Sequence, residues 1–168
     1  MISLCCSQVV RSRLGITGRP SAASEPTTRL GNWYVHLVRL GPRQLVLATS
    51  ERSLLTVILP ARDLRATIEG NLRIAVAQLL SAMNIPMEVV SRELAQMQPA
   101  LIAPATNRRV LGSMNEFAFH LGVRQDQISD PVEMAVSLSG IPMSAVGSKS
   151  RYGIPRDVAH ALLLSHGN

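Results

Sequence analysis

The stretch "NWYVHLVRLGPRQLVLATSERSLLTVILP", residues 32–60, contains three short runs of β-prone side chains separated by two turn sequences. Runs of four to eight such residues, alternating between two faces and bounded by turn residues, are typical of β-strands. The turns "GPR", residues 41–43, and "SERS", residues 50–53, are short enough to join neighbouring antiparallel strands. The stretch therefore predicts an antiparallel meander.

The segments on either side of this meander have different patterns. Upstream, "MISLCC" predicts a short buried strand, and residues 15–29 are rich in Gly, Pro, Ser and Thr, which is typical of a flexible loop. Downstream, the apolar period changes to about 3.6, which predicts a largely helical part from about residue 64 onward. The expected helices cover residues 64–83, 86–97, 106–121, 130–140 and 154–164. Residues 1–168 are therefore expected to form a single α+β domain, with a small antiparallel sheet of three to four strands packed against four to six helices.

The composition excludes several classes of protein. Of the 168 residues, 46% are hydrophobic and 17% are charged, so the chain can bury a core and is not disordered throughout. Aromatic residues make up only 3%, which argues against surfaces that bind nucleic acids by stacking bases on aromatic rings. No apolar run is long enough to cross a membrane, and the adjacent Cys5 and Cys6 do not suggest a disulfide framework. The sequence thus predicts a cytoplasmic protein, and it contains no motif for a metal or another cofactor.

Positive charge is concentrated in the first part of the chain. The net charge is +6, and residues 1–65 contain nine arginines against three acidic residues. Residues 66–148 contain five arginines against seven acidic residues. This asymmetry favours a polyanionic or acidic partner, although the excess of sixteen arginines over the single Lys149 is equally explained by a codon bias toward arginine instead of selection for phosphate contacts.

The segment "TNRRVLGSMNEFAFHL", residues 106–121, is expected to form an amphipathic helix with a polar stripe beside its apolar face. At helical spacing, that stripe contains Arg109, Gly112, Ser113, Glu116 and His120. The stripe belongs either to a ligand site or to the solvated side of an ordinary helix.

The start of this helix has the features of an anion site. Thr106 and Asn107 can cap its free amide groups, and Arg108 and Arg109 follow at once. Gly112 costs about 1 kcal/mol relative to alanine in a helix interior, which is easier to understand if something approaches the backbone closely. A packed helix with a capped start explains the same residues, so both interpretations stay open.

A second constellation combines "GNWY", residues 31–34, with "SERS" at the end of the second strand. Glu51 is a candidate base and Trp33 a candidate ligand contact. Alternatively, Glu51 and Arg52 form ordinary surface ion pairs, and Trp33 anchors the core.

The motifs "LGNWY", "LVLATSERSLLTVILPARD" and "TNRRVLGSMNEFAF" together resemble an uncharacterised bacterial family that is catalogued as a domain of unknown function. The resemblance covers residues 1 to about 121, and it implies no activity. Its motifs point to Asn32, Trp33, Glu51, Arg52, Asn107, Arg108, Gly112, Ser113, Met114 and Asn115. Arg109 stands where the family is expected to have serine, and Glu116 where aspartate is expected, which argues against a strict catalytic role for these two positions.

Three hypotheses follow. The favoured one is a non-enzymatic module that binds nucleic acid or an acidic protein through the basic first part of the chain and the "TNRR" helix start. The second is a small metal-independent enzyme on a phosphate-bearing substrate, such as a toxin-like nuclease or transferase, with Glu51 or Glu116 as base and Arg52 or Arg108 stabilising charge. The third is an interaction factor such as an antitoxin or adaptor, and a homo-oligomer is compatible with each. Binding is favoured over catalysis because sequence neighbours supply no complete catalytic set.

Overall fold

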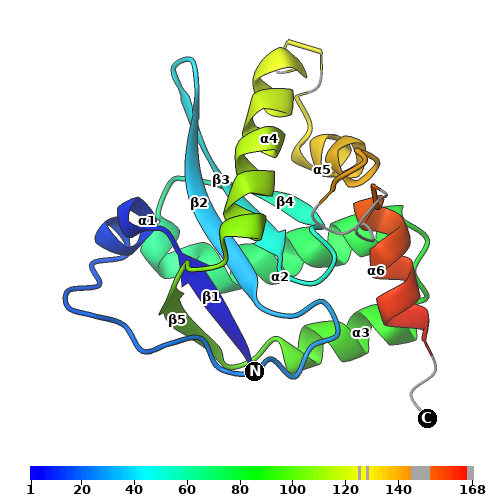
Figure 1. Ribbon diagram of the computed structural model, residues 1–168, viewed down its shortest axis with the longest axis horizontal. Helices are drawn as coiled ribbons and strands as arrows, with labels where there is room; N and C mark the ends of the chain where they lie inside the picture. The colour runs from blue at the N-terminus through cyan, green and yellow to red at the C-terminus, as the bar shows by residue number, and fades with distance from the viewer. Residues whose placement is uncertain (125, 128, 145–151, 166–168) are drawn as a thin grey trace.

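The structure is a computed structural model, and it describes residues 1–124, 126–127, 129–144 and 152–165. Within these residues the fold is α+β, with a five-stranded mixed sheet and six helices (Figure 1). In chain order the elements are β1 (Ile2–Cys6), α1 (Gln8–Arg13), β2 (Trp33–Leu40), β3 (Arg43–Ser50), β4 (Thr56–Pro60), α2 (Leu64–Ala82), α3 (Met87–Gln96), β5 (Ala100–Pro104), α4 (Arg108–Arg124), α5 (Pro131–Ser139) and α6 (Pro155–Leu164).

The sheet has the strand order β4-β3-β2-β1-β5. The antiparallel meander β2–β3–β4 is confirmed, with Trp33 opposite Ser50 in its first ladder. The expectation of an antiparallel sheet with three to four strands is wrong in its detail, because β1 pairs in parallel with both β2 and β5. Cys5 lies between Tyr34 on β2 and Ala103 on β5.

The strand β5 escaped prediction because it is short and ends in Pro104. Proline lacks the N–H group that a central strand needs, so the prolines at positions 99 and 104 do not favour a strand between them. The structure places β5 at the edge of the sheet, where a terminal proline is tolerated.

The two faces of the sheet are covered by different helices. On one face, alternate side chains such as Leu4, Cys6 and Trp33 pack with α1, α2, α3 and α6. On the other face, Cys5 and Tyr34 pack with α4 and α5. Figure 1 shows α4 standing along β2, and the two elements are in contact. The period-two alternation of β1 and β2 therefore separates two hydrophobic clusters.

Local signals account for several element boundaries. The side chain of Asp130 accepts hydrogen bonds from the backbone amides of Val132, at 2.6 Å, and Glu133, at 3.3 Å, so it caps α5. Gly140 ends the same helix. Residues 15–31 contain no helix or strand. None of the described helices has the length and apolar character needed to span a membrane.

Candidate functional site

The carboxyl ends of β1 and β5 lie side by side, because the two strands are parallel neighbours. The helix after β1, α1, packs through Val10 on the face that α2 covers. The helix after β5, α4, packs through Val110 and Phe117 on the opposite face. Adjacent parallel strands whose following helices diverge in this way leave a crevice between them, and ligands commonly bind there in α/β proteins.

The structure has a crevice of about 340 Å³ at this place. Ser7 and Gln8 come directly after β1, and Ala105 comes directly after β5. The remaining lining consists of His36 on β2 and of Leu111, Met114 and Asn115 on α4. Segments that are far apart in the sequence thus form one recess, which we call the switch crevice.

His36 is the titratable residue in this lining. Burial lowers the pKa of its imidazole, so the ring is neutral at pH 7. Its Nδ1 atom is buried and has no hydrogen-bond partner within the described residues. Nε2 is therefore the ring nitrogen that remains for a ligand or for solvent.

The structure separates the predicted residues of α4 into two groups. Asn115 lines the switch crevice, and Asn107 caps the helix, accepting hydrogen bonds from the backbone amides of Arg109, at 3.0 Å, and Val110, at 3.4 Å. Ser113 was expected on the polar stripe, but it is buried, and its hydroxyl donates to the carbonyl oxygen of Arg109 at 3.0 Å. A hydroxyl that bonds to its own helix can lie on the apolar face.

The surroundings of Gly112 differ from the expectation of a close contact. Gly112 is exposed, and a Cβ atom built there would meet no described atom within 4 Å. The described part of the sheet therefore does not approach this position. Arg108, Arg109 and Glu116 are also exposed, whereas Met114 is buried.

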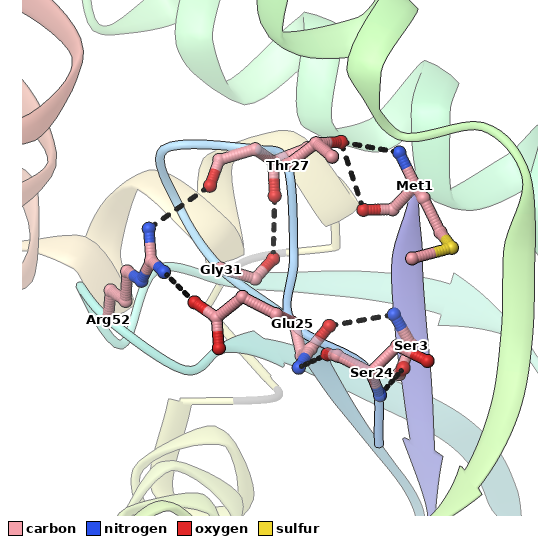
Figure 2. Close-up of polar contacts among 9 residues, drawn as sticks. Met1, Ser3, Ser24, Glu25, Thr27, Gly31 and Arg52 are labelled. Atoms are coloured by element: carbon pink, nitrogen blue, oxygen red, sulfur yellow. Dashed lines mark hydrogen bonds and ion pairs between the residues drawn. The ribbon is translucent and has the colours of Figure 1, made fainter.

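At the strand ends, Asn32 and Arg52 hold the loop that precedes β2, and Figure 2 shows Arg52 reaching Glu25 in that loop. The Oδ1 atom of Asn32 accepts from the backbone amide of Ser3 at 2.7 Å, and its Nδ2 donates to the carbonyl of Ser24 at 3.0 Å. The guanidinium of Arg52 pairs with Glu25 at 3.2 Å. These contacts give both residues a structural task.

Trp33 and its neighbour Tyr34 point to opposite faces of the sheet. Trp33 is 1% exposed and belongs to the cluster under α2, so it does not meet α4. Tyr34 lies on the α4 face, and its pKa is raised to about 12, first by burial and then by the charges of Cys5 and Glu51. The Asn107 backbone opposes this shift through a hydrogen bond.

The charge of Glu51 thus raises the pKa of Tyr34, whereas the hydrogen bond from the Asn107 backbone lowers it. The start of α4 contacts Tyr34 through the Asn107 backbone, and the sequence analysis did not single out this tyrosine. The signal was available, because strict alternation puts Tyr34 and Trp33 on different faces.

Exposed arginines lie near the end of α1, away from the switch crevice at its start. Arg13 donates to the side chain of Gln44, which stands opposite Arg39 in the β2–β3 ladder. Arg13 and Arg65 line one open hollow of about 350 Å³ at the start of α2. We call the set Arg13, Arg39 and Arg65 the arginine surface; all three residues are exposed. Among the described residues that line the hollow, Asp63 is the one acid.

Two other arginines of the first part of the chain serve the fold. Besides Arg52, Arg29 directs its guanidinium to the end of α6, where it donates to the carbonyl of Ser165 at 2.9 Å. The charge excess of residues 1–65 therefore reduces to a smaller set that faces solvent.

The family comparison covers most of the chain. Residues 3–158 match the model of the Domain of unknown function (DUF6933). The chain belongs to this family. Membership in DUF6933 confirms the resemblance to an uncharacterised family, and it brings no activity with it. Comparisons with curated proteins and with solved structures found no match.

In this DUF6933 domain, the part of the chain that the structure describes contains no group of three or more His, Cys, Asp or Glu residues placed to hold a metal ion. Cys5 and Cys6 are both fully buried. Burial is the main cause that raises the pKa of Cys5 to about 11 and that of Cys6 to about 12, so both thiols stay protonated at neutral pH.

Proposed function

We propose that this protein is a binding module for a polyanion, with nucleic acid as the expected ligand. The arginine surface carries this proposal. Three elements, α1, the β2–β3 hairpin and the start of α2, contribute its exposed guanidinium groups. Guanidinium groups bind phosphate oxygens in a bidentate geometry, and an arginine cluster with little acidic charge raises the local concentration of polyanions.

The start of α4 extends the proposed surface at a second place. Arg108 and Arg109 are exposed there, next to the capped helix end. A nucleic acid strand can contact several such points at once, and each phosphate that is neutralised adds to the affinity.

Binding has more support than catalysis for a geometric reason. A general base must come within hydrogen-bond reach of the substrate. Neither Glu51 nor Glu116 occurs among the described residues that line the switch crevice or the hollow at α2. Arg52, a candidate for stabilising charge, is paired with Glu25.

The test is fluorescence anisotropy of labelled single-stranded and double-stranded DNA and RNA, titrated with the full chain. We expect binding that weakens with added salt. We expect Arg13→Ala combined with Arg65→Ala to weaken the affinity at least about tenfold, since each lost phosphate contact removes its electrostatic contribution to the affinity. The matched control is Arg92→Ala combined with Arg156→Ala, because these exposed arginines lie on α3 and α6.

A third double variant, Arg108→Ala with Arg109→Ala, measures the part played by the start of α4. Polyglutamate serves as the acidic-protein probe. Polyglutamate binding without nucleic-acid binding would point to an acidic protein partner. No binding of any of these polyanions at low salt would refute the proposal.

A further inference from the structure

The switch crevice has the size and position of a small-molecule site. Its volume of about 340 Å³ lies in the lower part of the range of ligand pockets, which is roughly 300 to 1,000 Å³. We propose that this crevice binds an uncharged heterocycle of nucleobase or nucleoside size, which presents hydrogen-bond donors and acceptors along one edge.

The lining indicates a neutral, flat ligand. Its described polar groups are the carboxamides of Gln8 and Asn115, the hydroxyl of Ser7 and the imidazole of His36, and none of them is an acid or an arginine. A carboxamide offers one donor and one acceptor side by side, which matches the paired donor and acceptor of a heterocycle such as adenine. Leu111 and Met114 supply the apolar wall against which a flat ring can pack.

The imidazole of His36 adds a directed contact. A buried N–H group without a partner is costlier to tolerate than an acceptor with an unused lone pair. Because Nδ1 is buried and has no partner in the described structure, the ring proton belongs on Nε2. His36 thus presents a donor, and the ligand needs an acceptor at that point.

The helix α4 leaves room beside the crevice. Leu111 and Asn115 are separated by one helical turn, and Gly112 lies next to them on the same side of the helix. Since a Cβ atom at Gly112 would meet no described atom within 4 Å, the approach over this glycine is open.

The crevice is distinct from the arginine surface. The start of α1 supplies Ser7 and Gln8 to the crevice, whereas Arg13 at its end lines the hollow at α2. The proposal does not depend on polyanion binding, and the two can fail separately.

The experiment is an NMR titration of the full chain with methyl-labelled methionine. The seven methionines give few signals, and Met114→Leu identifies the signal of Met114. The probes are adenosine, guanosine, cytidine, uridine and nicotinamide. We expect saturable shifts of the Met114 methyl signal with at least one probe.

Two variants test the lining. Asn115→Ala removes an exposed carboxamide and is expected to weaken the binding about tenfold, which is the usual effect of losing one good bidentate pair. Leu111→Trp fills the crevice and is expected to abolish binding. The control is Asn71→Ala on α2, which leaves the crevice intact and should bind like the unmodified protein.

The outcomes are decisive in each direction. Saturable shifts that Asn115→Ala weakens and Asn71→Ala leaves unchanged support the proposal. An unshifted Met114 signal with all five probes at millimolar concentration overturns it. The proposal is also overturned if Asn115→Ala and Leu111→Trp both bind with the affinity of the unmodified protein. Loss of nucleic-acid binding in the Arg13→Ala, Arg65→Ala variant, with the nucleoside shifts retained, would support a crevice site that is independent of the arginine surface.

Discussion

Replacing Gly112 by alanine is expected to stabilise the protein. Gly112 lies in the interior of α4, is exposed, and has a backbone φ outside the left-handed region. The added methyl group would meet no described atom within 4 Å. Alanine is favoured over glycine by about 1 kcal/mol in a helix interior, so the free energy of unfolding should rise by about that amount. For a chain of this size, 1 kcal/mol corresponds to a rise in Tm of about 2 to 4 °C.

Gly31 provides the matched control with the opposite sign. Its φ is +84°, and a Cβ atom there would lie 2.9 Å from Cγ of Arg52. Gly31→Ala should therefore lower the free energy of unfolding by roughly 1 to 2 kcal/mol, with a further cost for moving Arg52. Urea unfolding followed by circular dichroism measures both variants. If Gly112→Ala destabilises the protein, something does contact this position, and our reading of an open helix face is incorrect.

Three further predictions follow from buried groups. Burial lowers the pKa of folded His36 below its ordinary value of 6.5, so the unfolded chain takes up the proton first as the pH falls. The free energy of unfolding should therefore fall as the pH drops below about 6.5. Urea titrations at several pH values measure this loss, and His36→Gln should reduce it. Cys5 and Cys6 should resist iodoacetamide in the native protein and react after unfolding, which mass spectrometry detects; rapid native alkylation would contradict their burial. The buried carboxylate of Glu93 accepts hydrogen bonds from the backbone amides of residues 29 and 30, each at 2.9 Å. Glu93→Ala leaves both amides without this partner, so it should lower the free energy of unfolding by about 3 kcal/mol or more. A change below about 1 kcal/mol would show that water takes the place of the carboxylate.

The sequence predicted the elements that repeat a local pattern. Alternation over residues 32–60 indicated β2, β3 and β4, and the 3.6 period indicated α2 and α4. The parallel pairing of β1 was not predictable in this way. Its partner β2 is reached through the long connection of residues 7–32, and its other partner, β5, comes after α2 and α3. Long-range pairing of this kind leaves no periodic trace in the chain.

The candidate site shows the same division. Asn107 and Asn115 were singled out from the motif in α4, and the structure gives them a capping contact and a place in the crevice. His36 was missed, since a histidine in an alternating strand looks the same whether it faces a cavity or a helix. Ser7 and Gln8 join the crevice only because β1 and β5 are parallel neighbours.

The salt dependence of nucleic-acid binding tests the role of the arginine surface most directly. For single strands, the slope of log K against log salt concentration changes by about 0.7 for each phosphate contact. Arg13→Ala combined with Arg65→Ala should therefore make the slope shallower by about 1.4, while Arg92→Ala combined with Arg156→Ala should leave it unchanged. Equal slopes for the two double variants would show that the arginines around α1 and α2 do not hold phosphate.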